Sequence, residues 1–297
     1  MVDLISLEPF KDLYPFKSHT LEIGALKYHY LDEGSGDILL MVHGNPTWSF
    51  YYRTLVLGLR RKYRCVVPDH MGCGLSDKPQ EYNYTLQQHI DNLSHLVESL
   101  ELNKITLLMH DWGGAIGMGL AVKHPDKIKR LVVFNTSAFL SERIPFSINI
   151  CRWPVFGPIA IRCFNAFAKS GIRRACMNQG RMTDQVKAGY LAPYNSFANR
   201  VANLRFVQDI PMSPDVPSYP VVQYIESQLS KFQDRPMVIV WGKKDFCFDD
   251  HFLNRWKEIF PHARVHEIAD AGHYVVEDAH ERIIPWLDKF FVDHPIS

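Results

Sequence analysis

The chain has 297 residues, enough for one large domain or for one domain that carries an insertion. Its hydrophobic content of 46% and charged content of 22% are ordinary for a folded globular protein. The formal net charge of +1 argues against nucleic acid or an anionic membrane surface as the main partner.

Residues 1–16 mix charged and apolar side chains and lack the apolar core of a signal peptide. No apolar run reaches the roughly 18 residues of a transmembrane helix. The cysteines show no CxxC spacing and are expected to be free thiols in a reducing compartment. The expected location is therefore the cytoplasm. The cysteines are Cys65, Cys73, Cys151, Cys163, Cys176 and Cys247.

Short apolar strands alternate with helices in the first part of the chain. Residues 86–100, for example, place apolar side chains at helical spacing. Such alternation is typical of a mostly parallel sheet covered by helices on both faces. We predict strands at 20–30 (a hairpin), 38–42, 65–67, 105–109 and 131–134, and helices at 50–59, 86–100 and 115–124.

The alternation stops between residues 139 and 212, a stretch rich in Arg, Phe and Cys that has helical pieces and no clear strand. Strands resume at 238–241 and 265–268, and a helix at 279–291 closes the chain. We therefore predict an α/β fold in three parts. Residues 1–138 and 213–297 form the core, and residues 139–212 form a helical cap.

The strand at 105–109 ends abruptly in His-Asp-Trp-Gly-Gly, and a helix follows at once. Strand, sharp turn and helix, with one reactive side chain at the apex, form the nucleophile elbow of α/β-hydrolases. Gly113 and Gly114 fit because so tight a turn leaves little room for Cβ atoms. The apex residue is Asp111. The alternative is that Asp111 only caps the helix that starts at Trp112.

An aspartate at this position indicates a particular chemistry. A carboxylate that displaces a leaving group from a saturated carbon forms an alkyl ester, which water can cleave, whereas a serine would form an ether. Asp111 is therefore a candidate nucleophile toward a saturated carbon. Water attack on its carboxyl carbon would then restore the enzyme.

Three further polar residues follow predicted strands: Asn45, Asp245 and His273. Ligands of open parallel sheets bind beyond the carboxyl ends of the strands, and the order nucleophile, acid, histidine is that of α/β-hydrolases. His273 is the candidate general base, and Asp245 would hold its tautomer. A lone histidine is more often structural, so the prediction rests on the whole set.

Asn45 and Trp112 would supply backbone N–H groups to an oxyanion hole. Their side chains are also neutral N–H donors, which suit a departing anion such as a halide or a carboxylate. Core packing is the alternative for Trp112. Two other motifs, Gly-Cys-Gly-Leu-Ser at 72–76 and Asp-Asp-His at 249–251, are interpreted as turns. No metal and no cofactor are expected.

Several motifs together resemble the haloalkane dehalogenase group of α/β-hydrolases. They are HGNPTW, PDHMGCGLSDKP, HDWGGAIG, WGKKD and DAGH. The resemblance implies Asp111 as nucleophile, His273 as base and Asn45 with Trp112 as leaving-group donors. Some members place the acid where this chain has Asn135, so Asp245 is implied instead, as in the third dehalogenase subfamily.

Other segments resemble the β-lactone decarboxylases of bacterial long-chain olefin biosynthesis. They are HGNPTWSFYYR, QDIPMSP and DFCF, with Gln208 where Arg is expected. The resemblance implies conversion of a cis-β-lactone to a cis-alkene and carbon dioxide. Asp111 would open the ring, at its alkyl or its acyl carbon. It also implies association with other enzymes of that pathway, although no charge run identifies a surface for them.

The alternatives are haloalkane dehalogenation by the same nucleophile, epoxide hydrolysis and a receptor or scaffold without turnover. Epoxide hydrolysis needs cap tyrosines as proton donors, for which Tyr190 and Tyr194 are candidates. In every enzymatic case the expected substrate is a hydrophobic small molecule. Four cap aromatics either line its pocket or pack the cap: Phe139, Phe164, Phe167 and Phe206.

Overall fold

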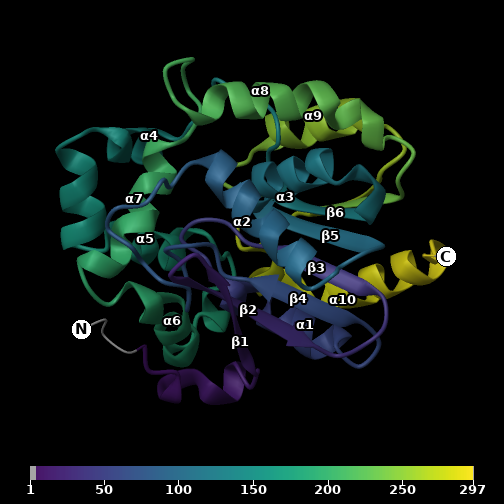
Figure 1. Cartoon of the computed structure of the whole chain (residues 1–297), viewed down its shortest axis with the longest axis horizontal. Helices are drawn as coiled ribbons and strands as arrows, with labels where there is room; N and C mark the ends of the chain where they lie inside the picture. The colour runs from purple at the N-terminus through teal and green to yellow at the C-terminus, as the bar shows by residue number, and fades with distance from the viewer. Residues whose placement is uncertain (1–4, 297) are drawn as a thin grey trace.

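The computed structural model describes residues 5–296, and its centre is an eight-stranded sheet (Figure 1). The strand order is β1-β2-β4-β3-β5-β6-β7-β8. The first two strands run antiparallel to their neighbours, and the other pairs are parallel. The strands are β1 (Ser18–Ile23), β2 (Leu26–Glu33), β3 (Ile38–Val42), β4 (Arg64–Pro68), β5 (Ile105–Asp111), β6 (Ile128–Thr136), β7 (Met237–Gly242) and β8 (Arg264–Ile268).

Helices cover both faces of this sheet. The helices α2 (Leu86–Ser99), α3 (Trp112–Lys123), α8 (Ser218–Gln228) and α9 (Asp250–Ile259) share one hydrophobic core with the sheet. On the opposite face, α1 (Arg53–Leu59) and α10 (Val275–Asp293) share a second core. The central strands β3 and β5 are almost wholly buried because both of their faces are covered.

The structure confirms the predicted fold class and every predicted strand, but several helices differ from the prediction. The predicted helix 50–59 begins with a 3-10 turn at 49–52, and the predicted helix 279–291 begins at Val275. The helix after the elbow begins at Trp112, directly after β5, because the turn is tighter than the Gly-Gly pair suggests. The helices α8 and α9 were not predicted. Asp249 was assigned to a turn, but its side chain accepts a hydrogen bond from the His251 N–H and caps α9.

Short helices follow β6 and gather at one side of the sheet, where Figure 1 shows α4 to α7. They are α4 (Phe146–Asn149), the π-helical turn η5 (Pro158–Cys163), α5 (Ala166–Arg174), α6 (Asp184–Leu191) and α7 (Val201–Gln208). We propose that residues 139–212 form the cap and that residues 1–138 and 213–297 form the core. No helix within residues 5–296 has both the length and the apolar character to cross a bilayer.

A buried ion pair joins this helical region to the core. Arg53 at the start of α1 forms two hydrogen bonds of 2.7 Å with the Glu277 carboxylate in α10. Tyr190 in α6 donates to the same carboxylate at 2.9 Å. Because all three side chains are buried, each compensates the desolvation of the others.

We predict that Gly113→Ala destabilises the protein by about 3 kcal/mol, at the upper end of ordinary overpacking. A Cβ atom at Gly113 would lie 2.0 Å from the Val42 carbonyl oxygen, which is backbone and cannot move aside. Calorimetry should show a lower Tm. As a control, Gly180→Ala meets only the Asn178 side chain, at 3.3 Å, and should leave Tm nearly unchanged. Equal Tm values for the two variants would contradict this account.

Candidate active site

The turn between β5 and α3 holds Asp111 in a strained backbone conformation. Its φ is 53° and its ψ is −129°, a region that costs a non-glycine residue about 1–3 kcal/mol. Although Asp111 precedes the first residue of α3, its side chain makes no capping hydrogen bond. The interpretation of Asp111 as a simple helix cap is therefore wrong.

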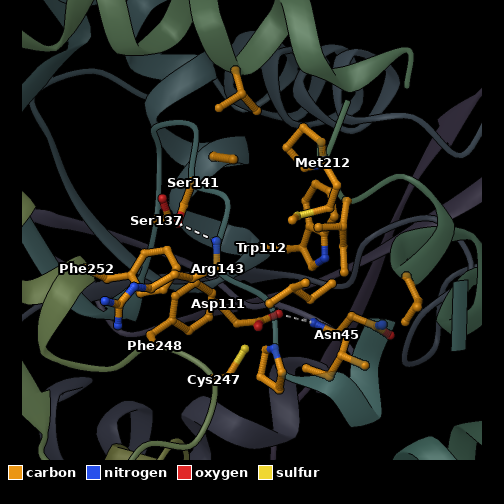
Figure 2. A pocket seen from close by; sticks show the side chains of 18 of the residues that line it. Asn45, Asp111, Trp112, Ser137, Ser141, Arg143, Met212, Cys247, Phe248 and Phe252 are labelled. Atoms are coloured by element: carbon orange, nitrogen blue, oxygen red, sulfur yellow. Dashed lines mark hydrogen bonds between the residues drawn. The ribbon is translucent and has the colours of Figure 1, made fainter. Parts of the chain in front are cut away.

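The loop after β3 approaches the Asp111 carboxylate closely. The Asn45 backbone N–H donates to Asp111 Oδ1 at 2.7 Å, as the dashed line in Figure 2 marks. A side chain at Gly44 would collide with this carboxylate, since its Cβ would lie 2.0 Å from Oδ1. Only glycine at position 44 allows the loop to deliver the N–H to the carboxylate.

The other two members of the candidate triad complete a line of hydrogen-bonding groups. His273 Nε2 lies 3.5 Å from Asp111 Oδ2, and His273 Nδ1 lies 2.9 Å from Asp245 Oδ2. All three side chains are buried. The structure thus brings together the carboxylate, imidazole and second carboxylate that were predicted at the ends of β5, β8 and β7.

The pKa values of Asp111 and His273 both lie above their ordinary values. Burial raises the pKa of Asp111, and the attraction of His273 with the N–H groups of Trp112 and Asn45 offsets only part of the effect. Burial alone would lower the pKa of His273. The charge of Asp245 and its hydrogen bond outweigh burial and raise the pKa of His273 above its ordinary value.

Asn45 and Trp112 line a cavity beside the Asp111 carboxylate. The Asn45 Nδ2 group donates to the Asn203 carbonyl in α7 at 3.2 Å. The Trp112 ring packs on Phe206 with 5.4 Å between ring centroids, and its indole N–H donates to no other group within residues 5–296. The packing interpretation of Trp112 is thus correct for the ring, while the N–H stays available at the cavity.

Several positioning groups were not identified from the sequence. The side-chain amide of Asn135 forms two hydrogen bonds with Gly242, the last residue of β7. Its Nδ2 donates to the Gly242 carbonyl at 3.0 Å, and its Oδ1 accepts from the Gly242 N–H at 2.8 Å. The Cys247 N–H donates to Asp245 Oδ1 at 2.6 Å, and His110 Nε2 lies 2.8 Å from the His273 carbonyl. Thr136 donates to the Asp111 carbonyl. Their only signal in the sequence was proximity to strand ends.

Two cavities meet at Asp111. The first spans about 830 Å³, part of it open to solvent, and extends toward Met212, Val222 and Phe252. The second spans about 1060 Å³, also partly open to solvent, and extends toward Ala160, Gly171 and Tyr274. Both are lined by the same junction residues, which are Asn45, Asp111, Ile148, Phe167 and Cys247. Figure 2 shows Cys247 and Phe248 beside the Asp111 carboxylate.

The cap aromatics divide between lining and packing. Phe139 and Phe167 line a cavity, Phe206 packs against Trp112 and His89, and Phe164 is exposed.

The two tyrosines suggested as proton donors for epoxide opening line neither cavity. The Tyr190 hydroxyl donates to Glu277, and that of Tyr194 donates to the Thr47 carbonyl. That assignment is wrong because both hydroxyls donate to protein groups outside the cavities. Within residues 5–296 no group of three or more His, Cys, Asp or Glu side chains is arranged to hold a metal ion.

We predict that Asp245→Asn lowers the pKa of His273, because the variant loses the charge that favours the imidazolium. At any pH near the transition, the variant should therefore hold a larger share of neutral imidazole. Histidine ring resonances followed by NMR across a pH titration measure this shift. Asp270→Asn removes an equal charge from an exposed position and is the control. An unmoved His273 transition in Asp245→Asn would contradict the assigned contact.

Comparison with known proteins places this chain in a family. A model of the alpha/beta hydrolase family matches residues 39–286. A cis-3-alkyl-4-alkyloxetan-2-one decarboxylase of Shewanella oneidensis is 47% identical, with 95% of this chain and 90% of that protein covered. One of Xanthomonas campestris is 41% identical, with 95% and 98% covered. Haloalkane dehalogenase 2 of Mycobacterium tuberculosis is 32% identical, with 94% and 96% covered.

Crystal structures of haloalkane dehalogenases share the fold. DatA from Agrobacterium tumefaciens superposes with a TM-score of 0.83 at 22% identity, covering 93% of this chain and 96% of that one. DbeA from Bradyrhizobium elkani gives 0.83 at 20% identity, covering 94% and 99%. The chain belongs to the alpha/beta hydrolase family, in the haloalkane dehalogenase-like group that includes the cis-3-alkyl-4-alkyloxetan-2-one decarboxylases.

Proposed function

We propose that this protein decarboxylates cis-β-lactones that carry two alkyl chains, and that it releases a cis-alkene and carbon dioxide. Relatives at 47% and 41% identity carry the corresponding name. The structural observation that carries the proposal is the pair of cavities that meet at the Asp111 carboxylate. A substrate of this class has two apolar chains on neighbouring ring carbons, and each chain requires its own space.

The shape and polarity of the cavities agree with this substrate. Apolar side chains such as Ile144, Val207 and Val222 line the first cavity, while Ile150 and Phe156 line the second. Their junction holds the polar groups, namely Asp111 and the Asn45 amide, with Trp112 on the side of the first cavity. An apolar site with a few convergent polar groups orients an apolar ligand by its reactive centre.

In the proposed reaction, Asp111 Oδ2 attacks the ring carbon that is bonded to the ring oxygen and to one alkyl chain. The carbon–oxygen bond of the ring breaks, its electron pair goes to oxygen, and an alkyl ester of Asp111 with a free carboxylate results. Loss of carbon dioxide then forms the double bond and expels the Asp111 carboxylate. Attack at the acyl carbon would instead leave an acyl-enzyme that carries an alkoxide. Hydrolysis of this acyl-enzyme gives a hydroxy acid and no alkene.

The stereochemistry of this route accounts for a cis product. Displacement by Asp111 inverts the attacked carbon, and an elimination in which the two leaving groups are anti to each other follows. Inversion followed by anti elimination has the same outcome as direct loss of carbon dioxide from one face of the ring. A cis ring therefore gives a cis alkene.

The remaining site residues receive roles from their positions. The Asn45 amide and the Trp112 indole N–H stabilise the carboxylate that ring opening releases, because neutral donors stabilise an anion without retaining it as an ion pair. His273 Nε2 lies 3.5 Å from Asp111 Oδ2, and Asp245 stabilises the imidazolium form of His273. In the second step, this positive charge stabilises the negative charge that forms on the Asp111 carboxylate as it leaves.

Haloalkane dehalogenation is the second candidate, since relatives at 32% identity bear that name and the same nucleophile serves. The dehalogenation differs from the lactone reaction in its second step. A haloalkyl ester has no carboxylate to lose, so His273 must activate water to cleave the ester at the Asp111 carboxyl carbon. A compact one-chain haloalkane would also leave one of the two cavities unfilled.

We further propose that the protein acts in the cytoplasm as a lyase of olefin biosynthesis, with the enzymes that supply its lactone.

We predict that purified protein converts a cis-β-lactone to alkene without incorporating solvent oxygen into Asp111. Water enriched in heavy oxygen and mass spectrometry of the Asp111 peptide measure this. Expulsion of an intact carboxylate leaves no label, whereas hydrolysis of an ester on Asp111 leaves one. A bromoalkane in the same assay is the positive control for labelling if halide is released.

Asp111→Asn should reduce lactone turnover by at least about a thousandfold, as expected for loss of a nucleophile. Mass spectrometry must exclude deamidation of the new asparagine, and Asp270→Asn is the control for charge.

Halide release from the bromoalkane with an untouched lactone would refute the decarboxylase and favour the dehalogenase. Labelled Asp111 after lactone turnover would refute the proposed second step.

We predict that both cavities are needed for a lactone with two long chains. Val222→Phe narrows the first cavity and Ala160→Phe narrows the second. Each should lower kcat/KM for that lactone about tenfold, within the range of overpacking costs. Shortening one alkyl chain should restore the rate. Tyr224→Phe, an exposed change in α8, is the control. If either cavity variant leaves every lactone unaffected, the substrate occupies a single cavity.

A further inference from the structure

The whole-chain charge conceals a strongly basic stretch in the helical region. Residues 143–183 contain no Asp or Glu, whereas the rest of the chain holds 26 Lys and Arg against 32 Asp and Glu. The seven basic residues of the stretch are Arg143, Arg152, Arg162, Lys169, Arg173, Arg174 and Arg181. The near-neutral total is therefore the sum of a basic segment and an acidic remainder, so the whole-chain charge does not argue against an anionic surface as the partner of this segment.

Most of these basic side chains have no carboxylate partner within residues 5–296. Arg143 pairs with Asp249 and Arg181 pairs with Glu281, and these two lie at the ends of the stretch. The five between them form no ion pair in the described part of the chain. Lys169, Arg173 and Arg174 are exposed on α5. The positive charge of these three α5 residues is therefore directed toward solvent, while Arg152 and Arg162 are half-buried.

Large apolar side chains are exposed in the same stretch. Phe146, Trp153 and Val155 keep 76%, 57% and 73% of their surface exposed, and Phe156, Ile159 and Phe164 are exposed as well. Six of the ten large hydrophobic side chains that are exposed in residues 5–296 thus lie between residues 146 and 164. A concentration of this kind marks a surface that meets another apolar phase.

We propose that the face formed by residues 146–174 docks on the surface of an anionic phospholipid bilayer. Exposed Trp and Phe side chains insert at the level of the headgroups, and Lys and Arg around them attract anionic lipid. The charge complementarity selects an anionic bilayer over a neutral one. A surface that binds a polyanion by charge alone does not need exposed apolar side chains. The exposed aromatic and aliphatic groups here therefore favour a bilayer.

The second cavity opens through this face. Phe146, Phe156 and Arg174 line that cavity and are also exposed. An apolar molecule held in the bilayer therefore has a short path to Asp111, which both cavities share. This role in substrate delivery rests on the proposed function. Binding to a bilayer does not, and it is measured without turnover.

The experiment is flotation of the protein with vesicles of phosphatidylcholine alone and of phosphatidylcholine with about 30% phosphatidylglycerol, which makes the surface negatively charged and attractive to Lys and Arg. We expect binding to the mixed vesicles that weakens as salt is raised. Trp153→Ser with Phe156→Ser, and separately Lys169→Glu with Arg173→Glu, should each weaken that binding at least about tenfold. None of these four residues belongs to the proposed triad or donor pair, and because Phe156 also lines the second cavity, the readout is vesicle binding and not turnover.

Matched controls lie on the core. Arg61→Glu with Lys231→Glu makes the same charge change at exposed positions of the core, and Val292→Ser removes an exposed apolar side chain from α10. Both should bind as the parent protein does. If the protein binds neither kind of vesicle, the proposal is overturned, and a protein partner is left as the occupant of this face. Equal weakening by the core variants would overturn the assignment of the face.

Discussion

A carboxylate buried at the end of β5 is the constraint on which the rest of the site depends. Removing a charge from water costs several kcal/mol unless hydrogen bonds and an opposite charge compensate it, so Asp111 requires the groups that surround it. The Asn45 N–H compensates one oxygen and His273 faces the other. The strained backbone at Asp111 is a further cost, and the packing of α3 against β5 and β6 sustains it. A site that retains so expensive an arrangement is organised for chemistry.

Much of this arrangement was predictable because it depends on local rules. Short apolar runs between helices predicted the strands, and the carboxyl ends of parallel strands predicted that Asp111, Asp245 and His273 would meet. The Gly-Gly pair after Trp112 predicted the tight turn. These inferences need only the chain order and the geometry of a parallel sheet. They therefore transferred directly from sequence to structure.

The positioning groups and the cavities could not be predicted in the same way. Asn135 bonds to Gly242, a residue more than a hundred positions away, and nothing near it in the sequence records that contact. The cap aromatics were ambiguous for a related reason. Phe164 and Phe167 lie in one short stretch, yet one is exposed and the other lines both cavities. Irregular helices with a π-helical turn do not follow a simple hydrophobic period, so sequence spacing does not reveal which side faces inward.

The hydrogen bond between the Asn45 amide and the Asn203 carbonyl has a mechanical consequence. Asn203 lies in α7, so one hydrogen of the Asn45 side-chain amide is committed to a helix of the proposed cap. A shift of α7 away from the core would break this bond and free the second amide hydrogen toward the cavity that Asn45 lines. The donor capacity of Asn45 is therefore tied to the position of a single helix.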